Sequence, residues 1–240
     1  MNNKPQPIIE VRHLRREYPL EDDPVTALDD VCLDIAPGEI CCIFGPSGSG
    51  KSTLLNQLAG LEPATSGAVR IRGTIINLLS QTQLTDFRRQ HMGFIFQSYN
   101  LLPHLSLLEN TALPLLFEGV DRKTRLARAR TLLKLVGLEN RMSHKPGQMS
   151  GGQQQRAGIA RAFITDPDIV FADEPTGNLD SKSSRMVMEL MHRLSRQHHK
   201  TIVIVSHDPE AAAWADHIIT LKDGKILEET WNTHTAPSGA

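Results

Sequence analysis

The sequence predicts an α/β domain in which helices wrap a mainly parallel sheet, with an N-terminal antiparallel β region and an α-helical insert. Three observations support this fold class. Residues 8–18 and 27–35 have the pattern of two strands joined by a turn at 21–24. Later in the chain, short apolar runs alternate with helical segments, which is typical of parallel sheets. Between these regions, residues 98–150 lack strand signals and contain the apolar spacing of helices.

The composition limits the classes of function. The 240 residues are 40% hydrophobic and 22% charged, and the formal net charge is -1. Such a chain is expected to fold as an ordinary soluble domain without the positive field of a dedicated nucleic-acid binder. Its longest apolar run, 112–117, is far shorter than the roughly 20 residues that span a bilayer. Because the first residues also lack the apolar run of a secretion signal, we expect a cytosolic chain with no nucleic-acid partner.

The remaining elements follow from apolar runs and periodicity. Strands are expected at 39–44, 68–71, 92–96, 168–172 and 201–205. Helices are expected at 52–59, 123–136, 184–195 and 209–216. Five side chains of the helix at 184–195 share one face and are expected in the core: Met186, Val187, Leu190, Met191 and Leu194. We expect a single domain over 1–240 in which 1–97 and 151–228 form the core, 98–150 a helical insert and 229–240 a loose tail.

A glycine-rich loop follows the strand at 39–44 and precedes the helix at 52–59. Its residues fit the pattern G-x-x-x-x-G-K-[ST]: Gly45, Pro46, Ser47, Gly48, Ser49, Gly50, Lys51 and Ser52, with Thr53 next. Such a loop turns backbone N–H groups toward phosphate oxygens, while Lys51 supplies a charge for the β- and γ-phosphates. The Ser52 hydroxyl is available to Mg²⁺. The motif and its context therefore predict a P-loop NTPase core.

Two adjacent carboxylates, Asp173 and Glu174, stand at the end of the apolar strand near 169–172. The carboxyl ends of strands are where ligands bind in open α/β sheets. There Asp173 can hold Mg²⁺ through a coordinated water, and Glu174 can orient the attacking water or accept its proton. Beside a P-loop, this pair predicts hydrolysis of a nucleotide.

The segment between these two motifs resembles the signature of ATP-binding cassette (ABC) ATPases: Gln148 to Arg156, with the sequence QMSGGQQQR. Other positions match the motifs of that family in order: Tyr18, Gln97, the stretch from Gly177 to Asp180, and His207. The resemblance covers roughly residues 7–228. One departure is Met149, where leucine is usual, and the two side chains are close in volume.

The resemblance implies a RecA-like core and a composite site in which two copies of the chain sandwich two ATP molecules head to tail. Ser150, Gly151, Gly152 and Gln153 would then face the γ-phosphate bound by the partner copy. His207 would hold the γ-phosphate, Gln97 would sense Mg²⁺ and water, and Tyr18 would stack on adenine. Asp180 would belong to the loop that touches the opposite subunit.

Several stretches further resemble the subgroup of macrolide-export, lipoprotein-release and cell-division ATPases, among them Arg88 to Gln97 and Ala172 to Ser181. The subgroup implies an ATPase that dimerises on MgATP and powers an integral membrane permease from the cytoplasmic face of the inner membrane. Export, lipoprotein release and mechanotransmission all remain open. The alternative is a soluble ABC ATPase acting on DNA or ribosomes, but such chains usually carry a coiled-coil insert or two cassettes.

We predict roles for two further surfaces of the helical insert. Residues 97–117 are the candidate contact with the permease, against the alternative that they pack within the insert. A basic run is expected to be a solvated helix face, although it could approach lipid headgroups: Arg122, Lys123, Arg125, Arg128, Arg130 and Lys134. The three cysteines, Cys32, Cys41 and Cys42, have neither disulfide nor zinc-ligand spacing and are expected to be buried thiols.

Overall fold

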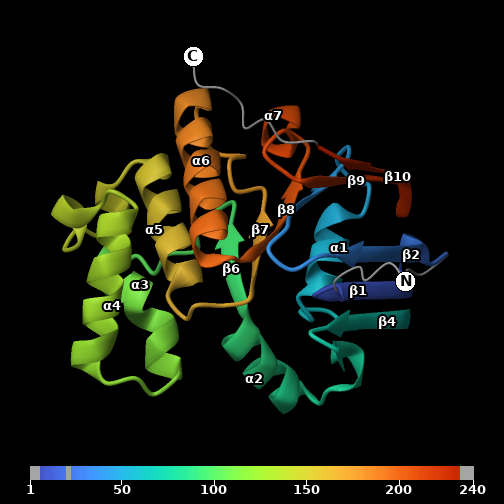
Figure 1. The fold of residues 1–240 in the computed structure, drawn as a ribbon, viewed down its shortest axis with the longest axis horizontal. Helices are drawn as coiled ribbons and strands as arrows, with labels where there is room; N and C mark the ends of the chain where they lie inside the picture. The colour runs from blue at the N-terminus through green and yellow to red at the C-terminus, as the bar shows by residue number, and fades with distance from the viewer. Residues whose placement is uncertain (1–5, 20–22, 233–240) are drawn as a thin grey trace.

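The computed structural model describes residues 6–19 and 23–232, in which two sheets are surrounded by helices (Figure 1). The strand order is β2-β1-β4-β5 in one sheet and β10-β9-β3-β8-β7-β6 in the other. Helices α3, α4 and α5 lie on one side of the molecule and the sheet of β1, β2 and β4 on the other (Figure 1). The predicted α/β class with an antiparallel β region is confirmed. The turn predicted at 21–24 falls largely outside the described residues.

The antiparallel sheet contains β1 (Ile9–Tyr18), β2 (Val25–Ile35), β4 (Ser66–Ile71) and β5 (Thr74–Ile75). In β1, Ile9, Val11 and Leu14 are fully buried, and the ladder to β2 shifts register between Val11 and Leu14. The alternation of buried and exposed side chains is that of a sheet with one face on the core.

The second sheet contains β3 (Ile40–Phe44), β6 (Met92–Phe96), β7 (Ile169–Asp173), β8 (Thr201–Ser206), β9 (His217–Lys222) and β10 (Lys225–Trp231). All its pairs are parallel except that of the edge strand β10 with β9. Successive side chains of a strand face opposite layers. Cys42 therefore packs in the core under α5 and α6, and Cys41 in the core shared with α1 and the antiparallel sheet.

The helices are α1 (Lys51–Leu58), α2 (Gln81–His91), α3 (Leu107–Phe117), α4 (Arg122–Leu135), α5 (Gly151–Phe163), α6 (Ser181–His198) and α7 (Pro209–Ala212). Short 3₁₀ turns occupy Ile76–Leu78, Glu139–Arg141 and Pro146–Gln148. Within the described ranges, no helix has both the length and the apolar character required to cross a bilayer.

Helix α2 and the strands β9 and β10 were not predicted; in α2, Leu84 is the only buried side chain and the sequence has no apolar stripe. Four expectations also need correction. Cys32 is half-buried, whereas Cys41 and Cys42 are buried as expected. Strand β10 extends to Trp231, so residues 229–231 are not a loose tail, and residues 233–240 lie outside the described part. Helix α7 ends at Ala212 rather than 216. On α6, Met186 is 45% exposed and Met188 is buried instead.

Candidate nucleotide-binding site

The glycine-rich loop between β3 and α1 is packed tightly against neighbouring backbone. A methyl group added at Gly45 would lie 2.2 Å from the carbonyl oxygen of Leu221, and one at Gly50 would lie 2.4 Å from that of Ala27. Gly50 also has φ +99°, a conformation that side chains disfavour. Glycine is therefore required at both ends of the loop.

The loop also has the chemistry of a phosphate cradle. Lys51 is only 6% exposed, and its Nζ donates to the carbonyl oxygen of Pro46 at 2.8 Å. Ser49 Oγ is buried and has no hydrogen-bond partner in the described part of the chain. Gly50 offers no side-chain cap to α1, and the first turn of that helix contains no acidic residue. Unpaired N–H groups, a positive helix end and a buried ammonium group together fit a polyanion.

The two predicted carboxylates stand at the end of β7 and are brought to the loop. Ser52 Oγ lies 3.4 Å from Asp173 Oδ1. Burial raises the pKa of Asp173 most, and the neighbouring charge of Glu174 raises it further. The hydrogen bond with Ser52 and the charge of Lys51 lower it, but by less. A raised pKa means that neighbouring protein groups do not fully balance the negative charge of this partly buried carboxylate. This arrangement suits a cation between Ser52 and Asp173.

Glu174 and His207 meet because β7 and β8 are neighbours that end at the same edge. His207 Nδ1 lies 2.9 Å from Glu174 Oε1. Glu174 has φ +42°, while its backbone N–H donates to the Val205 carbonyl oxygen at 3.0 Å. A left-handed conformation at a non-glycine residue is strained, and here it directs the carboxylate toward His207. Both side chains line a cavity of about 430 Å³.

Gln97 follows β6 and comes to the same edge. A methyl group added at Gly177 would lie 2.7 Å from Gln97 Nε2 and 3.2 Å from Glu174 Oε2, so all three residues are close. Asn178 Nδ2 donates to the Gln97 carbonyl oxygen at 3.1 Å. Gln97, Glu174 and His207, predicted from separate segments, are thus gathered at one site.

Ser150 is the N-cap of α5, and Gly151 to Gln153 belong to its first turn. The Ser150 and Gln153 side chains cap the helix reciprocally, with Ser150 N–H donating to Gln153 Oε1 at 3.0 Å. Within the described residues, no hydrogen bond or ion pair joins these residues to the loop at 45–53. Gly152 instead approaches the side chain of Ser183 on α6, and Asp180 caps that helix. Among the described residues, the signature therefore contacts α6 and has no polar contact with the chain's own phosphate loop.

Tyr18 has different neighbours from those expected of an adenine-stacking residue. Its hydroxyl donates to Glu62 Oε2 at 2.6 Å, and the Arg16 guanidinium lies 4.4 Å from its ring centroid. Asn56 on α1 donates to the same Glu62 carboxylate. One face of the ring is thus covered by arginine, and the other face alone could accept a base.

Arg161 on α5 is a positioning residue that sequence analysis missed. It donates to the carbonyl oxygens of Tyr99 and Asn100, which follow Gln97 and have φ +61° and +48°. A methyl group added at Gly151 would lie 2.6 Å from the Tyr99 hydroxyl. The turn after Gln97 is therefore fastened to the signature helix, a contact that no sequence spacing indicates.

Known proteins have the same fold and sequence pattern. A family profile described as ABC transporter matches residues 28–177. The chain is 48% identical over 221 residues to the macrolide export ATP-binding/permease protein MacB of Shigella flexneri, and 46% identical over 225 residues to that of Pasteurella multocida. These alignments cover 92% and 94% of this chain but 34% of each relative. The chain thus spans about a third of the length of these relatives.

Solved structures of ATP-binding cassettes have the same fold as this chain. A dimeric structure of the ATP-binding cassette MJ0796, in a post-hydrolysis state bound to ADP and Pi, matches with a TM-score of 0.86 at 42% identity. The match covers 93% of this chain and 98% of that one. CbiO1 of Clostridium perfringens matches with a TM-score of 0.84 at 25% identity, covering 94% and 88%. The chain belongs to the ABC transporter family, and it is an ATPase cassette of that family.

Proposed function

We propose that this chain hydrolyses MgATP at a site completed by a second copy of itself and drives a membrane permease. The observation that carries the proposal is the meeting of Gln97, Glu174 and His207 at the sheet edge beside the phosphate loop. The residues of 45–53 would bind the phosphates, with Lys51 neutralising charge on the β- and γ-phosphates.

Mg²⁺ is part of this proposal. Ser52 and Asp173 would hold it, with Gln97 as a further ligand or sensor. The oxygen donors and the raised pKa of Asp173 support a hard cation there. When bound, Mg²⁺ would neutralise charge on the phosphate oxygens.

Glu174 would orient the attacking water and accept its proton, while His207 contacts the γ-phosphate. The 2.9 Å contact between them supports a shared task, because each side chain limits the orientation of the other. Tyr18 would stack on adenine with the ring face that Arg16 leaves open.

Ser150, Gly151, Gly152 and Gln153 would complete the site of the partner copy. The N-terminus of the 13-residue helix α5 concentrates unpaired N–H groups and positive potential. The contacts of this segment with α6, and not with the chain's own loop among the described residues, support action in trans. The dimeric state of the MJ0796 cassette supports the same assembly. Asp180 would lie near the dimer contact.

Glu174→Gln tests the proposal. We expect hydrolysis to fall by about 10²- to 10⁴-fold while ATP affinity is retained, so that an ATP-bound dimer accumulates in size-exclusion chromatography with light scattering. Glu210→Gln is the matched control, because Glu210 lines the same cavity from α7 and is exposed. Adding Ser150→Arg to Glu174→Gln should abolish the dimer but not ATP binding. A monomeric Glu174→Gln protein at saturating ATP would refute the composite site.

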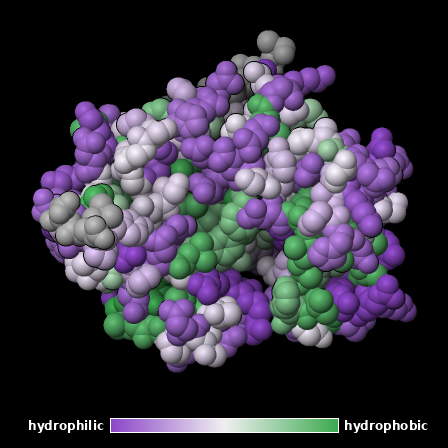
Figure 2. Space-filling view, turned by 180° about the vertical axis from the view of Figure 1, so that it is seen from behind, coloured by the Kyte–Doolittle hydropathy of each residue, from purple (hydrophilic) through white to green (hydrophobic). Residues whose placement is uncertain are grey.

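The permease would bind at the insert. An apolar cavity of about 520 Å³ opens between α2, β6, α3 and α5, lined by Phe94, Phe96, Leu113, Pro114 and Phe117 among others. Phe117 is 66% exposed, and the face opposite that of Figure 1 is hollowed near its middle, where apolar surface shows (Figure 2). This surface, which includes part of the 97–117 region, supports docking of an apolar segment of the permease.

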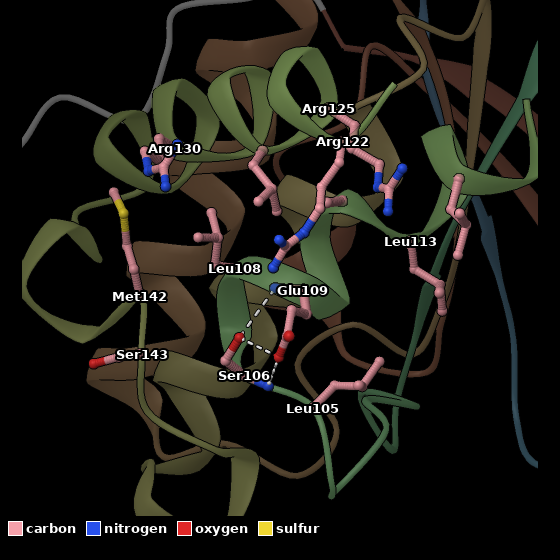
Figure 3. A pocket seen from close by; sticks show the side chains of 13 residues that line it. Leu105, Ser106, Leu108, Glu109, Leu113, Arg122, Arg125, Arg130, Met142 and Ser143 are labelled. Carbon is pink, nitrogen blue, oxygen red and sulfur yellow. Dashed lines mark hydrogen bonds between the residues drawn. The ribbon is translucent and has the colours of Figure 1, made fainter. Parts of the chain in front are cut away.

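A second groove on the insert also supports docking of the permease there. It lies between α3 and α4, with a volume of about 520 Å³, leucines on its floor, and Arg122, Arg125 and Arg130 at its rim (Figure 3). All residues of the basic run except the half-buried Arg125 are exposed, as expected of a solvated helix face, and three of the run also line this groove. Either groove would hold the chain at the cytoplasmic face of the inner membrane.

Copurification from native membranes in mild detergent tests this part. Recovery of an integral membrane protein, reduced by Leu113→Arg but not by the control Lys134→Ala, is the expected result. Export, lipoprotein release and mechanotransmission would be distinguished by the extracytoplasmic domain recovered. Recovery of only ribosomal or DNA-bound partners would favour the soluble alternative.

A further inference from the structure

A cluster of metal-ligating side chains lies outside the nucleotide site, at the amino ends of β3 and β9. Cys41 is paired with His217 in the parallel register of these strands, and Glu39 precedes β3 on the same face as Cys41. One carboxylate oxygen, the Sγ atom and one imidazole nitrogen of these residues all lie within 4.8 Å of one another. The phosphate loop leaves the opposite, carboxyl end of β3, so the two sites are separate.

The cluster is buried and incompletely satisfied. Cys41 and His217 are fully buried, and the Glu39 side chain is 13% exposed. Glu39 Oε1 lies 2.6 Å from His217 Nδ1. The Cys41 thiol is free and buried, with no hydrogen-bond partner among the described residues. These donors point toward one another in a medium of low dielectric, where polar groups without a partner are costly.

The far side of the imidazole has the environment of a metal-bound histidine. Among the residues that the structure describes, His217 Nε2 is buried without a hydrogen bond, yet it lies 3.3 Å from Glu229 Oε2 on β10. The ring of Trp231 stacks on the imidazole at 4.4 Å with an interplanar angle of 11°. A carboxylate behind one ring nitrogen commonly sets the tautomer and orientation of a histidine that ligates metal through the other.

An ion pair between Glu39 and His217 would explain part of this arrangement, but it leaves two observations unexplained. A second carboxylate, Glu229, stands beside the same buried ring, so one imidazole faces two carboxyl groups. Cys41 contributes nothing to an ion pair, yet it lies within ligand distance of both members.

We propose that Glu39, Cys41 and His217 form a binding site for a transition-metal dication of the Zn²⁺ class, with Glu229 orienting His217. Thiolate, imidazole and carboxylate are the ligands that Zn²⁺ takes, whereas Mg²⁺ takes oxygen alone. On a tetrahedral Zn²⁺ ion, ligand atoms stand about 3.3–3.7 Å apart. The 2.6 Å contact between Glu39 Oε1 and His217 Nδ1 would have to open by about 1 Å. Glu39 Oε2 accepts a hydrogen bond from the Ala36 N–H at 2.8 Å, so the shift is one of Oε1 about that anchored oxygen.

Metal uptake is measured on tag-free full-length protein without nucleotide or Mg²⁺, so the result does not depend on the proposed ATPase mechanism. The probes are Zn²⁺, titrated in competition with a chromophoric chelator, and Co²⁺, whose thiolate charge-transfer band reports Cys ligation. We expect one equivalent of each ion per chain and a thiolate band with Co²⁺. Glu229→Gln should weaken Zn²⁺ binding by about 10- to 100-fold.

Matched variants locate the ion. Cys41→Ala and Glu39→Gln should remove stoichiometric binding and the rise in melting temperature that Zn²⁺ produces. Cys42→Ala should retain both, because its thiol belongs to the same strand but faces the opposite core. Cys32→Ser should also retain both. Cys32 belongs to a second group with His13 and Asp30, and the side chains of those two are 77% and 70% exposed.

Three results would overturn the proposal: no stoichiometric uptake by the wild-type chain, uptake that survives Cys41→Ala and Glu39→Gln, or uptake that Cys32→Ser removes. Circular dichroism without metal shows whether each variant folds. If Cys41→Ala does not fold, Glu39→Gln decides the question, since it keeps the side-chain volume and removes only the charge.

Discussion

Arg161 fastens the turn after Gln97 to the signature helix, and its replacement by lysine measures the strength of that link. Tyr99 and Asn100 both have left-handed backbone conformations, each of which costs about 1–2 kcal/mol for residues other than glycine. The Arg161 guanidinium donates from Nη1 to the Asn100 carbonyl oxygen and from Nη2 to that of Tyr99, the latter at 2.9 Å. The turn therefore depends on a planar group that reaches two acceptors at once.

Lysine keeps the charge but presents a single ammonium group. Arg161→Lys should lose one charge-assisted hydrogen bond, worth about 1.5–3 kcal/mol, and leave one carbonyl oxygen of a strained turn without its partner. Because such a turn can open locally without unfolding the domain, the free energy of global unfolding should fall by no more than about 2 kcal/mol. The larger effect should be local, on the position of Gln97.

Hydrogen exchange of the amides of 97–101 is the direct assay, with urea denaturation and steady-state ATP hydrolysis beside it. We expect faster exchange in this segment and slower hydrolysis with unchanged ATP affinity. Arg128→Lys makes the same chemical change on the exposed face of α4 and should stay within about 0.5 kcal/mol of wild type. If Arg161→Lys matches this control in exchange and in hydrolysis, the link does not position Gln97.

Three further predictions follow from single contacts. Lys51→Ala should lower ATP affinity, measured by titration calorimetry, because it removes the buried ammonium group of the phosphate loop; unchanged affinity would refute that role. Gly45→Ala should destabilise the fold by about 1–3 kcal/mol in urea denaturation, since its methyl group would overlap the Leu221 carbonyl; wild-type stability would show that the loop can shift. Burial raises the pKa of Asp168, but hydrogen bonds from His91 and Arg72 outweigh it and leave the pKa lowered. The ionised Asp168 therefore stabilises the fold fully above its unfolded-state pKa of about 3.9, and this contribution is lost as the pH falls through its lower folded-state pKa. Asp168→Asn should cost roughly 1 kcal/mol at pH 7 and progressively less as the pH falls below about 3.9, and a cost independent of pH would contradict this assignment.

The elements that sequence analysis located best are those with short apolar runs. The expected strand at 92–96 coincides with β6, and that at 201–205 differs from β8 by one residue. Both are fully or largely buried, so nearly every position had to be apolar. The strand-loop-helix unit around Lys51 was equally clear, because its glycines are required by backbone contacts at 2.2 and 2.4 Å.

Of the elements that were missed, strand β9 has alternating apolar residues at 217–222 that were not assigned to a strand, whereas helix α2 lacks such a signal. Helix α2 buries only Leu84, and a reciprocal cap between Ser80 and Gln83 helps to define its start, so neither composition nor periodicity marks it. On α6, helical spacing alone did not decide between Met186 and Met188, two residues apart. The α5 surface against which Met188 packs is a tertiary property.

Side-chain groupings across strands follow a single geometric rule. Neighbouring parallel strands begin at one edge of the sheet and end at the other, so residues at corresponding positions meet although the sequence separates them widely. At the carboxyl edge this rule brings Glu174 to His207, and motif order anticipated the pair. At the amino edge the same rule brings Cys41 to His217, but no motif describes that edge, and cysteine spacing along the chain argued against zinc. Spacing rules detect metal sites built from one local segment, whereas ligands held by paired strands become visible only when the strand register is known.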